Sequence, residues 1–138
     1  MARLYSNPWK SRIGVQSKIK YLIRGQFYKW LLRKYCKGCK SVLDVACGPG
    51  QFMKVADSLG FKAYGVDADG RHKAKNVIIR DLWKLNGKYD VVFNSMILEH
   101  VDDQEKFVKK MCDLSSNIVI TVSEYLSRSF YNVPDHKT

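Results

Sequence analysis

The chain has 138 residues, enough for one domain with a hydrophobic core and too few for two. Its 46% hydrophobic and 12% aromatic residues argue against a disordered chain, and no apolar run approaches the ~20 residues of a membrane-spanning helix. The formal net charge is +11, which suggests an anionic partner. The N-terminus lacks a secretory signal pattern, so we expect a cytoplasmic protein without a membrane span.

The basic residues are concentrated at the N-terminus. Residues 1–43 contain 11 Lys and Arg and no acidic residue, since the first acidic residue is Asp44. The other 95 residues hold 13 basic and 13 acidic ones. We therefore predict an anionic partner for residues 1–40, such as nucleic acid, a phosphorylated small molecule or an acidic membrane surface. The alternative is a solvated basic face that only aids solubility.

The first two predicted segments are an irregular arm over residues 1–14 and a helix from near Val15 to near Tyr35. Apolar residues recur at helical spacing at Val15, Ile19, Leu22, Ile23, Phe27, Trp30 and Leu31. Basic pairs lie on the other side, so we expect an amphipathic helix that packs its apolar stripe on a sheet. Membrane docking is the alternative. We assign residues 1–40 to this basic arm and helix, and 41–138 to the core of the same single domain.

After Gly38, short apolar runs alternate with turn residues and helical segments. Strands are predicted at Ser41–Ala46, Lys62–Val66, Asn76–Ile79, Tyr89–Asn94 and Asn117–Ser123, and helices at Gln51–Ser58 and Asp102–Leu114. This alternation predicts a mostly parallel, doubly wound α/β sheet. Asp102 is the expected N-cap of the second helix. Its buried face is expected to contain Phe107, Val108 and Met111.

Cys36 and Cys39 form a C-x-x-C pair between the first predicted helix and the first predicted strand. No second pair follows at the spacing of a zinc ribbon. A connecting loop is therefore favoured over a metal or redox site.

The segment V-L-D-V-A-C-G-P-G-Q-F, residues 42–52, is the most specific signal in the chain. A buried strand ends there in a Gly-x-Gly turn that lets backbone approach a ligand, and the turn opens a helix with free N–H groups. Asp67 ends the next predicted strand, where a carboxylate can accept hydrogen bonds from ribose hydroxyls. Asp81 ends the third, where it can accept from an adenine amino group. Together these strand ends predict a nucleoside-binding edge.

This order of motifs resembles the class I S-adenosylmethionine-dependent methyltransferase superfamily over residues 42–124, in particular its branch with an L-D-x-x-C-G-x-G signature. The resemblance implies S-adenosylmethionine (SAM) as cofactor and a Rossmann-like α/β sheet of about five strands, without the usual C-terminal antiparallel pair. The cofactor-binding residues that it implies are Asp44, Ala46, Cys47, Gly48, Gly50, Asp67, Ala68, Asp81, Leu82 and Asn94. Asp44 would order the glycine turn, Asp67 would hold the ribose and Asp81 the adenine.

The segment N-S-M-I-L-E-H-V, residues 94–101, resembles the L-E-H-V segment of the same superfamily. The catalytic residues that this resemblance implies are Asn94, Ser95, Glu99 and His100. Asn94 and Ser95 would lie nearest the transferable methyl group. The segment departs from the N-P-P-Y type pattern of enzymes that methylate exocyclic amines of bases, which disfavours that reaction.

A metal site is a sharper alternative. Glu99, His100 and His136 match part of the ligand set of metal-assisted RNA 2′-O-methyltransferases and of some quinone O-methyltransferases. Those enzymes have a further glutamate where Met96 stands here. Losing one carboxylate weakens a site for a hard cation, so we predict no metal.

A nicotinamide-binding Rossmann domain is the competing fold. It requires a third glycine in G-x-G-x-x-G for close helix–strand packing, and Met53 occupies that position. Asp44 and Asp81 also have no role in such a domain. A flavodoxin-like sheet with incidental acidic residues is disfavoured on the same grounds.

The resulting hypothesis is a SAM-dependent methyltransferase whose acceptor is nucleic acid, preferably RNA, attracted to residues 1–40. The alternatives are a small-molecule or protein methyltransferase, and a non-catalytic SAM-binding module or partner subunit. The sheet of the superfamily normally continues beyond its fifth strand, so that strand is expected at a bare edge. The tail from Glu124, a second copy in a homodimer, or further chain of a longer protein would cover it.

Overall fold

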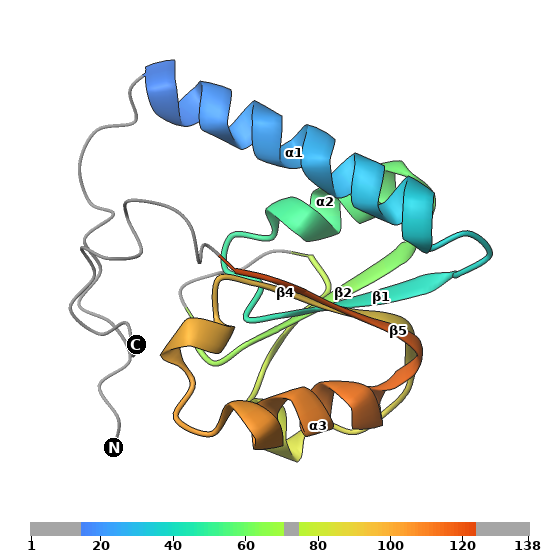
Figure 1. Cartoon of the computed structure of the whole chain (residues 1–138), viewed down its shortest axis with the longest axis vertical. Coiled ribbons are helices and arrows are strands. Elements are labelled where there is room, and N and C mark those ends of the chain that lie inside the picture. Colours follow the sequence, from blue (N-terminus) through green and yellow to red (C-terminus); the bar gives the residue numbers. More distant parts are fainter. Residues whose placement is uncertain (1–14, 71–74, 124–138) are drawn as a thin grey trace.

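The structure is a computed structural model that describes residues 15–70 and 75–123. Within them, a five-stranded sheet lies between helices on its two faces (Figure 1). The strands are β1 (Ser41–Val45), β2 (Lys62–Asp67), β3 (Val77–Ile79), β4 (Tyr89–Ser95) and β5 (Ser115–Val122). The helices are α1 (Val15–Tyr35), α2 (Gln51–Ser58) and α3 (Gln104–Leu114), with short 3-10 helices η1 (Leu82–Lys84) and η2 (Leu98–His100).

The strand order is β3-β2-β1-β4-β5, and every neighbouring pair is parallel. From β1 the chain winds to one side through β2 and β3, then crosses to β4 on the other side of β1. Helices α1 and α2 cover one face and α3 the other (Figure 1). The predicted doubly wound parallel sheet is thereby confirmed. Among the described residues, no helix has the length and hydropathy needed to cross a bilayer.

The predicted strand boundaries differ from the observed ones by one or two residues, and α2 has the predicted bounds. The predicted N-cap of α3 was wrong. Asp103, not Asp102, precedes the helix, and its carboxylate accepts a hydrogen bond from the Lys106 N–H at 2.9 Å. Consecutive aspartates both satisfy the capping pattern, so only the backbone geometry separates them.

The core has two layers, one on each side of the sheet. On the α1 and α2 side, Phe52 and Phe93 stack with ring centroids 3.6 Å apart, and Tyr28 meets both rings edge-on at 5.3 Å. On the α3 side, Phe107, Met111 and Leu114 are buried. The predicted burial of Val108 was wrong, since it is 37% exposed. It follows Phe107 directly and is therefore turned about 100° away from the buried face.

The face of α1 that packs on the domain also differs from the prediction. The buried residues are Tyr28, Leu31 and Leu32, so Leu31 is the one buried member of the predicted stripe among residues 18–35. Five members of that stripe are between 40% and 64% exposed: Ile19, Leu22, Ile23, Phe27 and Trp30. The physical reason is that α1 has 21 residues and rests on α2, which has only 8 and leaves the opposite face of α1 uncovered (Figure 1).

Close packing between α2 and the sheet depends on Gly65 in β2. A Cβ atom there would lie 2.5 Å from Met53 Sδ and 2.6 Å from Cys47 Sγ. Glycine is therefore required by the approach of these two side chains, since real Cβ atoms do not come so near. In a nicotinamide-binding turn, the third glycine of G-x-G-x-x-G lies on the helix and allows this close packing. Here Met53 occupies that helix position, and the glycine is Gly65 on β2.

Candidate functional site

The candidate site lies at the carboxyl edge of the sheet, where β1, β2 and β4 end. Strands β1 and β4 are neighbours from which the chain departs to opposite sides of the sheet. Open α/β sheets bind ligands at such a topological switch point, just beyond the carboxyl ends of the strands. In Figure 1 this edge is on the left, where the short orange helix η2 lies.

The glycine turn that follows β1 has left-handed backbone at three positions. The φ angles are 57° at Ala46, 51° at Gly48 and 81° at Gly50. The Ala46 N–H donates to the Val66 carbonyl at 2.8 Å, which joins the turn to β2. Helix α2 begins directly after Gly50 and has no acidic residue in its first turn. Its free N–H groups can therefore meet an anionic group of a ligand.

Asp67, at the end of β2, is fixed by two backbone donors. Its Oδ2 accepts from the Gly48 N–H and its Oδ1 from the Asp69 N–H, both at 2.8 Å. A carboxylate has about four lone pairs, so each oxygen can also accept from a ribose hydroxyl. The bond to Gly48 orders the glycine turn, a role that the sequence prediction gave to Asp44.

Asp44 lies in the middle of β1 and is only 4% exposed. Burial, reinforced by the nearby charge of Asp67, raises the pKa of the Asp44 carboxyl well above its ordinary value. Cys47 in the glycine turn is buried as well, and burial raises the pKa of its thiol to about 12. Cys47 therefore stays a neutral thiol at physiological pH and is not a nucleophile.

The adenine end of the predicted site lies beside β2. Asp81 is exposed, and its Oδ1 accepts from the Trp83 N–H at 3.0 Å, which caps η1. The preceding Arg80 N–H donates to the Asp67 carbonyl at 3.2 Å and so holds this segment next to the end of β2. Leu82 is half-buried and Ala68 is exposed. The adenine contacts of Asp81 and Leu82, and the cofactor contact of Ala68, stay predictions.

Asn94 and Ser95, at the end of β4, face opposite sides of the sheet. Asn94 is fully buried, and its Nδ2 donates to Met111 Sδ at 2.8 Å and to Thr121 Oγ1 at 3.0 Å. Ser95 is half-buried, and its Oγ accepts from the Tyr28 hydroxyl at 3.4 Å. The Asn94 side chain therefore joins β4 to α3 and β5, while Ser95 faces α1.

Tyr28 is a site residue that the sequence analysis missed. It is 4% exposed, and burial raises the pKa of its hydroxyl. Its contact with Ser95 brings α1 to the carboxyl edge of the sheet. Its burial could have been predicted from its position one helical turn before Leu32, which places both residues on one face. The apolar stripe that the sequence analysis assigned to the buried side lies mainly on the opposite face.

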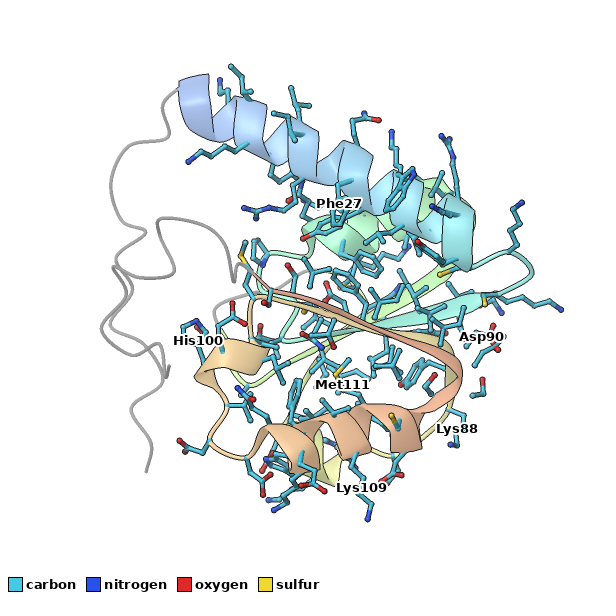
Figure 2. All side chains as sticks on the ribbon, viewed as in Figure 1. Phe27, Lys88, Asp90, His100, Lys109 and Met111 are labelled. Atoms are coloured by element: carbon cyan, nitrogen blue, oxygen red, sulfur yellow. The ribbon has the colours of Figure 1, made fainter. Side chains whose placement is uncertain are left out.

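Glu99 and His100 lie in η2, close beyond the end of β4. Glu99 is 7% exposed, and its Oε2 has no hydrogen-bond partner among the described residues. A buried carboxylate oxygen needs a donor, so a ligand, water or undescribed part of the chain must supply one. His100 is half-buried, and Figure 2 shows it at the end of the molecule opposite Asp90, which lies at the start of β4.

The predicted set of metal ligands is only partly visible. Within residues 15–70 and 75–123, no three His, Cys, Asp or Glu side chains gather in a way that could hold a metal. His136 lies outside the described residues. Met96 has a left-handed backbone with a φ of 57°. The absence of a metal therefore stays a prediction.

The C-x-x-C pair lies in the turn between α1 and β1, as predicted. All four cysteines are free. Burial raises the pKa of Cys36 to about 11, and Cys39 Sγ accepts a hydrogen bond from Asn117 Nδ2 at 3.7 Å.

Comparison with known proteins decides between the competing families. Residues 16–136 match the model of a methyltransferase domain family. The chain belongs to this methyltransferase family. It is 28% identical over 113 residues to the ubiquinone biosynthesis O-methyltransferase of Pelagibacter ubique, a match that covers 70% of this chain and 47% of that protein. The methyltransferase chain thus spans about half the length of this curated relative.

Solved structures agree with the family. A SAM-dependent methyltransferase from Archaeoglobus fulgidus has a TM-score of 0.61 and 25% identity, over 91% of this chain and 67% of that one. The magnesium protoporphyrin IX methyltransferase of Synechocystis PCC 6803, solved with bound SAM, has a TM-score of 0.62 and 21% identity, over 80% and 63%. The predicted SAM-dependent methyltransferase fold, family and cofactor are confirmed, and the nicotinamide-binding interpretation is set aside.

Proposed function

We propose that this methyltransferase chain forms the cofactor-binding part of an enzyme that methylates a hydroxyl oxygen of a small molecule. The observation that supports cofactor binding is the fixed carboxylate of Asp67 beside the glycine turn, and the one that supports the acceptor is the buried Oε2 of Glu99. The residues present fit the cofactor, because Asp67 keeps free lone pairs and the first turn of α2 keeps free N–H groups. When bound, SAM supplies an electrophilic methyl group on a sulfonium.

On the cofactor side, the chain binds and orients. The backbone of residues 46–50 holds the amino-acid part, Asp67 accepts from the ribose hydroxyls and Asp81 accepts from the adenine amino group. Asp44 lies beneath the turn as a buried carboxyl. A positive charge in the site favours its ionised form, so ligand binding and ionisation of Asp44 reinforce each other.

On the acceptor side, we assign the free Oε2 of Glu99 to the acceptor hydroxyl. Bound SAM would supply the methyl group to the acceptor oxygen and leave as S-adenosylhomocysteine, and Glu99 would take the hydroxyl proton. Ser95 and His100 complete the wall of the acceptor site. We assign Asn94 to positioning rather than to contact with the methyl group, because its side chain is fully buried against Met111. The name of the Pelagibacter relative supports an oxygen acceptor.

The first experiment is calorimetric titration of the chain with SAM, S-adenosylhomocysteine and NAD. We expect binding of the first two and none of NAD. Replacing Asp67 by Ala removes charge-assisted hydrogen bonds and is expected to weaken SAM binding by roughly 1.5–3 kcal/mol, about 10- to 150-fold. The matched control is Asp113→Ala on the exposed side of α3, which leaves binding unchanged. Binding of NAD alone overturns the proposal, and unchanged affinity in Asp67→Ala overturns the ribose contact.

RNA is a second candidate acceptor, favoured by the 11 basic residues without an acidic one before Asp44. Methyl transfer from radiolabelled SAM separates the two, with total RNA and a mixture of small phenols as alternative acceptors. Label in the phenols but not in RNA supports the proposal, and label in RNA alone replaces it. SAM binding with no transfer to either pool favours a non-catalytic module or partner subunit.

A further inference from the structure

Helix α1 has an apolar stripe on the face turned away from α2 and the sheet. We define this outer stripe as Ile19, Leu22, Ile23, Phe27 and Trp30, which recur at intervals of three and four residues and so share one side of the helix. Leu22 and Ile23 are each 64% exposed. Phe27 stacks on Trp30 with ring centroids 5.9 Å apart. Large aliphatic and aromatic side chains gathered on an outer face indicate an interaction surface.

Basic residues border the outer stripe on both sides. By helical position, Lys18, Lys29 and Arg33 lie along one border and Lys20, Arg24 and Lys34 along the other. No acidic residue occurs in α1. At its C-terminal half, a shallow groove is lined by Gln26, Lys29, Trp30, Arg33, Lys34 and Lys37. The surface therefore combines an apolar centre with cationic borders and suits an anionic, partly apolar partner.

Two other occupants fit this surface less well. A second copy would bring two cationic faces together with no acidic residue of α1 between them, which is unfavourable. RNA would use the lysines, the arginines and the ring of Trp30, because phosphates need cations and bases stack on aromatic rings. It offers nothing to Ile19, Leu22 and Ile23, since aliphatic side chains provide no stacking surface.

We propose that α1 docks lengthwise on an anionic lipid bilayer and inserts its outer stripe at the boundary between headgroups and acyl chains. Interfacial helices use this composition, with apolar and Trp side chains in the bilayer and Lys and Arg on lipid phosphates. A helix of 21 residues spans roughly 30 Å, which provides a contact several lipids long. Lys34, whose Nζ lies 4.9 Å from the ring centre of Trp30, brings a charge to the depth at which Trp prefers to lie.

The docked helix would place the candidate site beside the bilayer. Gln51, the first residue of α2, donates through Nε2 to the Tyr21 carbonyl at 2.6 Å, and Tyr28 reaches Ser95. The middle of α1, from Tyr21 to Tyr28, thus runs over the carboxyl edge of the sheet. An acceptor that dissolves in the membrane would meet the site there. This last consequence rests on the proposed function, whereas the docking itself does not.

The experiment is flotation of the full chain with vesicles of phosphatidylcholine alone and of phosphatidylcholine mixed with phosphatidylglycerol. We expect binding to the mixed vesicles only, and weaker binding as salt is raised. Replacing Lys20 and Arg24 by Ala together is expected to weaken binding about 20- to 30-fold, from ~1 kcal/mol for each charge. The matched control replaces Lys88 and Lys109, which Figure 2 shows away from α1 across the sheet, and is expected to weaken binding less.

A second pair of variants tests the apolar part of the surface. Ile19→Ser combined with Ile23→Ser is expected to weaken binding at least about tenfold, since two aliphatic side chains no longer enter the bilayer. Val108→Ser on α3 also removes an exposed aliphatic side chain, and it should bind as the natural chain does. Calorimetric SAM binding, unchanged in all variants, shows that they are folded and keeps this test separate from the proposed function.

Three outcomes overturn the docking proposal. The first is absence of binding to the mixed vesicles. The second combines two results. The double isoleucine variant binds the vesicles as the natural chain does, and the natural chain binds single-stranded RNA whereas the variant without Lys20 and Arg24 does not. The third is a fall in sedimentation mass in the double isoleucine variant, which would assign the outer stripe to a contact between copies.

Discussion

Ala46 illustrates how the site constrains single residues. It is exposed and has a φ of 57°, a conformation that costs a residue with a Cβ roughly 1–2 kcal/mol. The positive φ turns the chain after Ala46 so that the Cys47 N–H also donates to the Val66 carbonyl, at 3.3 Å beside the Ala46 N–H at 2.8 Å. A small side chain lessens the strain but does not remove it.

We predict that Ala46→Gly raises the free energy of unfolding by about 1 kcal/mol, because glycine adopts positive φ without strain. Urea denaturation measures the difference, and SAM affinity should hardly change. A decrease in stability would show that the methyl group of Ala46 makes a contact that stabilises the fold by more than the positive φ destabilises it.

Asp44 makes the stability of the domain depend on pH. Burial raises its pKa in the folded chain above the value of about 4 in the unfolded chain, so the folded state holds the proton more tightly. The stabilisation is complete below the unfolded pKa and is lost as pH rises through the folded pKa. We predict that the melting temperature falls as pH rises above about 4, and that Asp44→Asn reduces this fall. The control Asp113→Asn changes an exposed carboxylate and should leave the fall in melting temperature as it is in the natural chain. If the melting temperature of Asp44→Asn falls as steeply as that of the natural chain, another group causes the pH dependence.

At this scale the sequence predicted where residues lie along the strands better than which residues they contact. Gly48 and Asp67 could be placed from the motif, because a Gly-x-Gly turn and a strand-end acid have few other uses. That Asp67 also holds Gly48 could not be predicted, since it depends on the approach of two loops. The burial of Asn94 follows from its alternation with Phe93 on β4, a signal that was available and was not used.

Helix α1 shows where pattern reasoning fails at the scale of elements. Its length and bounds were predictable from apolar spacing. Its buried face was not, because the helix has apolar residues on two sides, one with Tyr28 and Leu32 and the other with the outer stripe. The choice between them depends on where α2 lies, and Gln51 and Val55 of α2 lie beside Gly25 of α1. This is information about tertiary packing that the local pattern does not contain.

The packing of α2 on β2 gives a sharper prediction. Gly65→Ala places a Cβ 2.5 Å from Met53 Sδ, so we expect a loss of roughly 1–3 kcal/mol in the free energy of unfolding. Gly25→Ala is the matched control, since its Cβ would lie 3.6 Å from the nearest atom, Gln51 Nε2. That change is expected to stabilise α1 by roughly 0.5–1 kcal/mol. Unchanged stability in Gly65→Ala would mean that the close contact at Gly65 relaxes without cost.

At the scale of the whole molecule, the charge is unevenly distributed along the chain and one edge of the sheet is unpaired among the described residues. The basic excess lies in residues 1–43, of which α1 occupies one face of the sheet, whereas the remaining residues balance their charges. Strand β5 ends the sheet, and no other described strand pairs with its outer side. Both features were predictable from the sequence, because charge counts and strand number need no packing information. Homodimer formation through β5 stays a prediction, for which sedimentation equilibrium is the measurement.

The pairing of Met53 with Gly65 bears on how such chains are recognised. Close approach of a helix to a sheet requires one position without a side chain, but either partner can provide it. A motif search that requires a third glycine in the turn would miss chains in which the glycine is on the neighbouring strand instead. In distant relatives we expect the two positions to exchange together, with glycine at 53 accompanied by a larger residue at 65, because either change alone leaves a clash or a void.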